Sequence, residues 1–158
     1  MMHSIDIQST LEHESNNLPS DEQLESWVNK TLSGLSEISE MTIRIVNAEE
    51  IQSLNQTYRH VNKPTNVLSF PAEIPDEIDL ALLGDIVICS SVVEKESVEQ
   101  QKSLEAHWAH MVIHGTLHLL GYDHLDDKEA EEMESKEIEI LCHFGYPNPY
   151  LIKENISN

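Results

Sequence analysis

The segment His-Gly-Thr-Leu-His-Leu-Leu-Gly-Tyr-Asp-His, residues 114–124, decides the fold of this chain. His114 and His118 are four residues apart, so on a helix their rings lie on one face, one turn apart. Gly121 stands where a helix commonly ends in a residue with positive φ, and His124 follows three residues later. The segment therefore predicts a helix that ends at Gly121 and a chain that returns a third imidazole to the first two.

Three neutral imidazoles around one point, with a fourth position left open, are typical of a catalytic zinc site. We therefore predict that His114, His118 and His124 bind one zinc ion per chain. The full spacing, with a glycine where the chain must turn, is more specific than two histidines four residues apart, which often mark only a surface helix. The competing interpretation is a group of core or surface histidines that binds no metal.

The same spacing occurs in the metzincin proteases, H-E-x-x-H-x-x-G-x-x-H, but Gly115 stands where those enzymes carry their glutamate. A metallopeptidase needs that carboxylate to activate water. The sequence thus predicts a zincin-like scaffold without ordinary metalloprotease chemistry. Glycine inside a helix is destabilising by roughly 0.5–1 kcal/mol relative to alanine. Gly115 therefore either permits close helix packing or leaves room for a bulky substrate beside the metal.

Two further histidines precede the cluster. His107 and His110 lie on nearly the same helical face as His114. They are either structural or act behind the metal ligands as hydrogen-bond donors or proton shuttles. Asp123, next to His124, either orients a ligand or a water molecule, or only shapes the turn.

Outward from this segment, the hydrophobic periodicity predicts alternating strands and helices. A capping box at Ser20, a cap at Asn47, a cap at Ser90 or Ser91 and a cap at Asp126 or Asp127 mark the helix starts. The predicted strands are residues 3–9, 41–46, 67–70 and 82–89, and the predicted helices are residues 20–32, 47–58, 90–120 and 126–145.

This element order predicts an α+β domain. We expect one zincin-like unit in which a mixed β-sheet of about four strands packs against helices, one of them a long metal-binding helix. The apolar strand 82–89 is expected at the centre of the sheet. We place the domain at residues 1–146 and expect a loosely ordered tail at 147–158, where Pro147 and Pro149 prevent a helix from restarting.

The charge of the chain restricts its ligands. With 29 acidic and 9 basic residues, the net charge is −20. Such a surface repels phosphate backbones, which argues against non-specific binding of nucleic acid. An anionic substrate would need a local basic or metallic site, or delivery by a partner.

Cysteine usage and hydropathy predict the compartment. Cys89 and Cys142 are far apart and are expected to be reduced thiols. The first residues lack the pattern of a signal peptide, and no apolar run is long enough to span a membrane. We therefore expect a cytoplasmic protein.

The segment 114–124 resembles the signature of the YbeY family of bacterial endoribonucleases. Tyr58-Arg59, Pro64–Pro71 and Leu83–Ile86 resemble further blocks of that family, in the same order and spacing, so that the resemblance covers roughly residues 40–145. Asn66 stands where the family often has Asp.

The resemblance implies a zinc-dependent, single-strand-specific endoribonuclease. Its substrate would be ribosomal RNA, near the 3′ end of the small-subunit RNA, and its role would be rRNA maturation and ribosome quality control. The family also implies a zincin-like fold and a partnership with the ribosome or small-subunit ribosomal proteins. His114, His118 and His124 would be the metal ligands, and Arg59 the cationic group of the substrate cleft.

The residues around Arg59 support this role in part. Arg59, His60 and Lys63 form a small basic patch in an acidic chain. A guanidinium can bond two phosphate oxygens at once. The alternative for Arg59 is a surface ion pair at a helix end.

Three functions follow from these patterns. In the first, a metal-assisted endoribonuclease, the metal would polarise a phosphoryl oxygen and lower the pKa of water. The nucleophile would be water or the 2′-hydroxyl, and His110, Asp85 and Asp123 are the candidate bases. The second is an amide hydrolase of the zincin kind, which Gly115 opposes. The third is a ribosome-associated factor with mainly structural zinc, whose acidic surface would dock on basic ribosomal proteins.

Overall fold

The computed structural model describes residues 2–11, 17–73 and 81–151 of the chain. This part contains four strands and five helices. The elements are β1 (Ser4–Ser9), α1 (Asp21–Thr31), β2 (Glu40–Val46), α2 (Ala48–Arg59), β3 (Val67–Pro71), β4 (Leu82–Cys89), α3 (Ser90–Glu99), α4 (Leu104–Leu119) and α5 (Asp127–His143). The predicted mixed α+β single domain with a sheet of four strands is confirmed.

The four strands form one mixed sheet in the order β1-β2-β4-β3. β1, β2 and β4 are parallel, and β3 runs antiparallel to β4, with Ser69 opposite Ile86. The prediction that 82–89 lies inside the sheet is confirmed, since β4 has a neighbour on each side. β3 is left at one edge of the sheet, beside α4.

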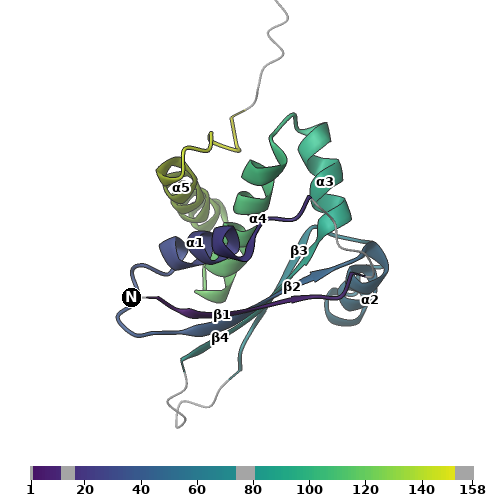
Figure 1. The fold of residues 1–158 in the computed structure, drawn as a ribbon, viewed down its shortest axis with the longest axis horizontal. Coiled ribbons are helices and arrows are strands. Elements are labelled where there is room, and N and C mark those ends of the chain that lie inside the picture. Colours follow the sequence, from purple (N-terminus) through teal and green to yellow (C-terminus); the bar gives the residue numbers. More distant parts are fainter. Residues whose placement is uncertain (1, 12–16, 74–80, 152–158) are drawn as a thin grey trace, which may run out of the picture.

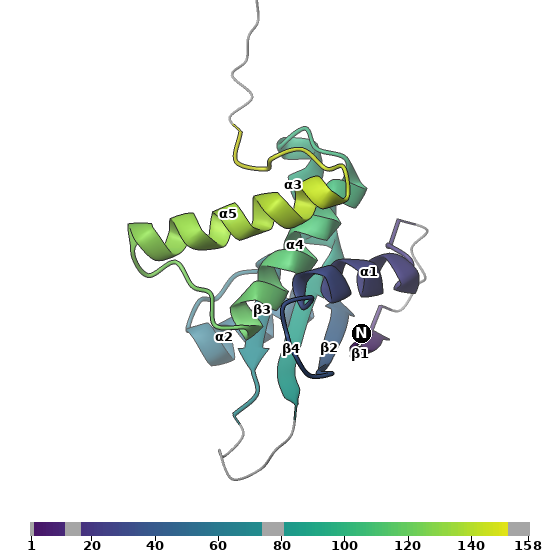
Figure 2. The same cartoon turned by 90° about the vertical axis from the view of Figure 1, so that its left-hand side faces the viewer.

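Helices cover the sheet unequally (Figure 1). Along β4, Ile86 and Ile88 point to the larger core, which α1, α4 and α5 complete, while Val87 and Cys89 point to a smaller core on the face covered by α2. This alternation makes β4 apolar on both faces, as expected for a strand buried on both sides. α4 lies between α5 and the sheet, so it is buried on most of its surface (Figure 2).

The predicted helix caps at Ser20 and Asn47 are confirmed, and of the two residues predicted for the last helix, Asp126 is the cap. The predicted cap at Ser90 or Ser91 is wrong, because α3 follows Cys89 as its N-cap and has no side-chain cap hydrogen bond. Ser20 and Gln23 form the reciprocal capping box, and Asn47 and Asp126 each accept a hydrogen bond from the backbone N–H three residues on. These bonds satisfy N–H groups that the first turn of a helix leaves without partners.

The prediction of one long helix over residues 90–120 is wrong. The segment forms two helices, α3 and α4, separated at Gln100–Ser103. Gln101 has a φ of 56°, in the left-handed region, and ends α3. Ser103 then caps α4 by accepting from the N–H of Ala106. No glycine or proline marks this break, because an ordinary residue takes the left-handed conformation.

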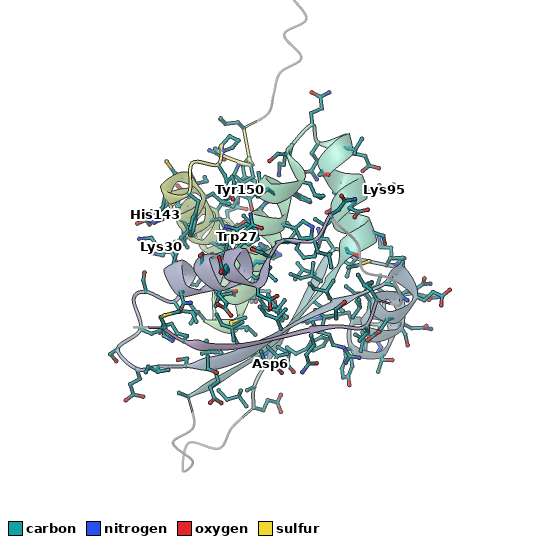
Figure 3. All side chains as sticks on the ribbon, viewed as in Figure 1. Asp6, Trp27, Lys30, Lys95, His143 and Tyr150 are labelled. Carbon is teal, nitrogen blue, oxygen red and sulfur yellow. The ribbon has the colours of Figure 1, made fainter. Side chains whose placement is uncertain are left out.

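Part of the predicted tail packs against the domain. Residues 147–151 are described, and the hydroxyl of Tyr150 donates to Glu137 on α5 over 2.7 Å. Figure 3 shows Tyr150 between α5 and α4. Residues 152–158 of the predicted tail lie outside the described part of the chain.

Cys89 and Cys142 are both free thiols. No helix of the described residues has the length and hydrophobicity needed to cross a membrane.

Candidate metal centre

Four histidines form a row along α4. The ring centroids of His107 and His110 are 6.1 Å apart, those of His110 and His114 are 6.2 Å apart, and those of His114 and His118 are 4.6 Å apart. Spacings of three and four residues place these side chains on one helical face. The row runs from the buried start of the helix to its exposed end, where His114 and His118 open onto a cleft.

The turn after α4 brings His124 to this cleft. The N–H of Gly121 donates to the carbonyl of His118, and the N–H of Tyr122 donates to the carbonyl of Leu117. This pair of bonds is a Schellman motif, which needs a left-handed residue after the helix. Gly121 supplies it with a φ of 99°, as predicted. The chain therefore reverses at once and returns His124 alongside the helix end.

The rings of the three predicted ligands lie next to one another in the structure. The ring of His124 lies 6.0 Å from that of His114 and 5.2 Å from that of His118. The Nε2 atoms of His114 and His118 are 3.2 Å apart. These three residues line one cleft of about 600 Å³, together with Arg59.

The environment of His118 favours the neutral imidazole. Burial lowers its pKa, and the neighbouring His114 and His124 lower it further. A metal binds the unprotonated ring nitrogen, so a depressed pKa keeps this donor available at neutral pH. The donor set therefore suits zinc, which prefers imidazole nitrogen.

A buried carboxylate lies behind His114. Glu137 is fully buried on α5, and its Oε2 is 3.4 Å from Nδ1 of His114. Its Oε1 is 2.5 Å from Nε2 of His110 and accepts from Tyr150. Burial raises the pKa of Glu137, but the hydrogen bonds from the two histidines outweigh this effect and lower it to about 2. His110, His114 and Glu137 thus form a second set of side chains with the chemistry to hold a metal.

A second carboxylate network holds the other end of the row. Nε2 of the buried His107 is 2.9 Å from Oε1 of Glu96 on α3. The same carboxylate accepts from the side-chain amide of Asn66 at 3.1 Å. Asn66 also accepts from the N–H of Val67 at the start of β3. His107 therefore has a structural partner, and this network ties α4 and α3 to the strand that borders the cleft.

Arg59 enters the cleft from the end of α2. Its guanidinium donates to the backbone carbonyl of Ser69 on β3 at 3.1 Å. The hydroxyl of Ser69 donates in turn to the carbonyl of Gly115 on α4 at 3.0 Å. Arg59 is thus held by the cleft wall rather than by an acidic side chain among the described residues, which disfavours the surface ion pair as its role.

A sequence model of the family described as "Endoribonuclease YbeY" matches residues 8–145. This chain belongs to the YbeY endoribonuclease family. The solution structure of TM1509 from Thermotoga maritima resembles this YbeY-family chain with a TM-score of 0.60 and 30% sequence identity, over 87% of this chain and 86% of that one. Family membership supports an endoribonuclease role in rRNA maturation, and therefore hydrolase chemistry.

Gly115 was predicted either to permit close helix packing or to leave room for a bulky substrate. The structure of this YbeY chain favours close packing. A Cβ atom there would lie 3.1 Å from Ile86, 3.2 Å from Val67 and 3.3 Å from Ser69. The missing side chain lets α4 approach β3 and β4, so that the carbonyl of Gly115 reaches Ser69. A glutamate at this position would press on the sheet, which opposes a metallopeptidase mechanism.

We expect Gly115→Ala to destabilise the protein by about 1–2 kcal/mol. Overpacking typically costs about 1–3 kcal/mol, and the better helix propensity of alanine offsets part of it. Urea unfolding measures the difference. Gly34→Ala is the matched control, because no atom lies within 4 Å of the added carbon. Equal stability of the Gly115→Ala protein would show that the sheet yields without cost.

We expect Asn66→Asp to destabilise the YbeY chain, although the family often has Asp at this position. The new carboxylate would stand about 3 Å from that of Glu96, where the amide now donates. Because Glu96 is partly exposed to solvent, we expect a loss of about 1–2 kcal/mol. The measurement is the urea midpoint at neutral pH. The double variant with Glu96→Gln restores a donor and should recover most of the loss. No recovery would contradict the assigned contact.

The three candidate bases occupy different places. Asp123 lines the cleft and accepts from the N–H of His124. His110 is buried behind His114, bonded to Glu137. Asp85 is an exposed residue of β4 and is not among the residues that line the cleft. Of these three residues, only Asp123 therefore lines the cleft that contains the predicted metal ligands.

Sequence reasoning missed Glu137 and Tyr150. Both reach the histidine row from segments that follow the motif by more than ten residues. A signal for Glu137 was present, since it recurs with Met133, Ile140 and Leu141 at helical spacing on the buried side of α5. A carboxylate on the apolar face of a helix requires a buried partner.

Proposed function

We propose that this chain is a zinc-dependent, single-strand-specific endoribonuclease. Its substrate is ribosomal RNA near the 3′ end of the small-subunit RNA, and it serves rRNA maturation and ribosome quality control in the cytoplasm. The YbeY family supports the endoribonuclease role, and the geometry of the cleft supports the dependence on metal.

The proposal that His114 and His118 bind zinc depends mainly on one distance. Nε2 of His114 and Nε2 of His118 are 3.2 Å apart. Two nitrogen ligands of a tetrahedral zinc ion, each bonded at about 2.0–2.1 Å, are about 3.3 Å apart. His124 stands beside both rings and supplies the third nitrogen. When bound, one zinc ion supplies Lewis-acid stabilisation of a phosphoryl oxygen and promotes ionisation of a nucleophile.

Arg59 is proposed as the catalytic cation of the cleft. The bond to Ser69 uses one of five guanidinium N–H donors and fixes the direction of the side chain. The remaining donors can bond a phosphate fork, and they offset the negative charge that grows on the phosphoryl group in the transition state. Asp123 is proposed to hold a proton of the nucleophile or of the leaving group, because it is the candidate base that lines the cleft.

The acidic exterior is proposed to select the partner. A net charge of −20 repels RNA at long range, so the basic and metallic groups of the cleft are the places where a phosphate is attracted. Docking on small-subunit ribosomal proteins, which are basic, would bring the cleft to RNA and suits an acidic surface. This partnership stays a prediction.

The test is cleavage of a single-stranded RNA and of a matched duplex by the purified full-length protein. We expect cleavage of the single strand, loss of activity on treatment with a chelator, and recovery on addition of zinc. Cleavage that persists unchanged after zinc has been removed would contradict the metal dependence. Equal cleavage of the duplex would contradict the strand specificity.

A further inference from the structure

Glu137 is a carboxylate at a fully buried position, where loss of hydration makes a charge energetically unfavourable. It is 0% exposed, on the buried side of α5 beside Met133 and Leu141. A buried charge is tolerated only when hydrogen bonds satisfy it. Both oxygens of Glu137 meet donors, and two of these donors are imidazoles of the row on α4. The residue therefore has a specific arrangement with α4 rather than a general packing role.

The two nitrogens of His114 face different groups. Nδ1 faces Oε2 of Glu137 at 3.4 Å, and Nε2 faces Nε2 of His118 at 3.2 Å. A carboxylate accepts but does not donate, so it keeps the proton of a neutral imidazole on Nδ1. The lone pair of Nε2 is then directed into the cleft. Imidazoles that bind metals are commonly fixed in this way by a carboxylate on the far nitrogen.

We propose that Glu137 is a positioning residue for the metal ligand His114. From α5 it holds the Nδ1–H of that imidazole, which sets the tautomer and the ring orientation that present Nε2 to zinc. The proposal rests on the metal site of the proposed function and adds to it a residue outside the motif 114–124. α5 thereby becomes part of the metal centre, although it contributes no ligand.

A rival arrangement would make Glu137 a ligand itself, with His110 and His114. The distances oppose it. Oε1 of Glu137 and Nε2 of His110 are 2.5 Å apart, which is a hydrogen bond and is shorter than the roughly 3.3 Å between two ligands of one zinc ion. Tyr150 occupies the same oxygen. His114 would also have to bind through Nδ1, which would leave its Nε2 facing His118 without a function.

The substitution Glu137→Gln separates the two arrangements. Glutamine keeps the shape of the side chain and offers one oxygen, which suits the two donors His110 and Tyr150. Its amide then faces Nδ1 of His114 and donates to it, which places the histidine proton on Nε2. That tautomer must be lost before zinc binds. We expect the fold to persist and zinc affinity to fall about 10- to 100-fold, as for other partners of metal ligands.

The experiment titrates zinc(II) into the full-length protein in competition with a coloured chelator. Tyr150→Phe is the matched control, because it removes a donor from the same carboxylate and leaves the contact with His114. We expect a much smaller loss for it. Equal losses in both variants, or no loss in a folded Glu137→Gln protein, would overturn the proposal. Two zinc ions per chain, one of which survives in His118→Ala and is lost in Glu137→Gln, would make Glu137 a ligand instead.

A second measurement needs no variant. Nitrogen chemical shifts of the imidazoles in the zinc-free wild type report the tautomer of His114, and we expect the proton on Nδ1. A proton on Nε2 would overturn the proposal even if the variants failed to fold. The outcomes also distinguish a failure of the zinc site from a failure of the positioning role of Glu137. A wild type that takes up no zinc removes the metal site of the proposed function, whereas zinc bound equally by wild type and Glu137→Gln removes only the role of Glu137.

Discussion

Replacing His118 with alanine is expected to remove bound zinc and to abolish RNA cleavage. The wild type should carry about one zinc ion per chain, because three imidazoles with one open position complete a catalytic site. His118 contributes the nitrogen that faces His114 at 3.2 Å. Two remaining ligands hold zinc weakly, so we expect affinity to fall by at least about 100-fold, more than for a residue that only orients a ligand. Elemental analysis after dialysis measures the content.

The control for this prediction is His143→Ala. His143 is an exposed histidine at the end of α5, and its ring contacts Phe144. The His143→Ala substitution removes an imidazole that does not line the cleft, so zinc content and cleavage should not change. Zinc retained at one ion per chain in the His118→Ala protein would show that His118 is not a ligand. Cleavage retained by a zinc-free His118→Ala protein would separate the metal from the reaction.

Replacing Arg59 with alanine should slow cleavage by about 100- to 1,000-fold and leave zinc content unchanged. Loss of one preorganised donor to the developing charge of a transition state has effects of this size. Arg59 lines the same cleft as the three histidines, but its hydrogen bond goes to Ser69 and not to them, so the metal should stay in place. Arg59→Lys keeps the charge and loses the planar fork, and we expect it to recover only part of the rate. Single-turnover cleavage at saturating protein measures the effect.

Lys95→Ala is the charge-matched control for Arg59. Lys95 lies on α3 (Figure 3) and is not among the residues that line the cleft. Its replacement by alanine removes the same unit of positive charge as Arg59→Ala. If both variants slowed cleavage equally, the effect would come from the net charge of the chain. A loss confined to Arg59→Ala would assign it to the guanidinium in the cleft.

Local signals in the sequence predicted most of the elements. Ser20, Asn47 and Asp126 cap helices because their side chains bond the nearest free N–H groups, a contact that depends only on neighbouring residues. Gly121 ends α4 for a similarly local reason. The break at Gln101 was not predicted because glutamine is not a residue type that favours the left-handed conformation, so no local signal marked it.

The residues of the candidate site also fall into two groups, those that local spacing predicts and those that only helix packing brings together. His114, His118 and His124 fall within eleven residues, so helical spacing and one turn suffice to bring them together. Glu137 and Tyr150 meet His110 only after α5 and the following segment have packed on α4. Such contacts depend on the direction in which one helix crosses another, which a single sequence does not specify. A buried carboxylate at an apolar position was the sign that a partner existed, without naming the partner.

The place of β3 at the edge of the sheet has a consequence for self-association. An edge strand presents unpaired backbone groups, on which a strand from another copy can add, and natural sheets protect such edges. On β3, Arg59 occupies the carbonyl of Ser69, and Pro71 has no N–H to offer. The guanidinium that we propose for substrate binding thus also occupies a backbone group to which another strand could pair. A chain without the Arg59 guanidinium is expected to leave the Ser69 carbonyl of β3 unpaired. Two copies could then pair their edge strands and begin to aggregate.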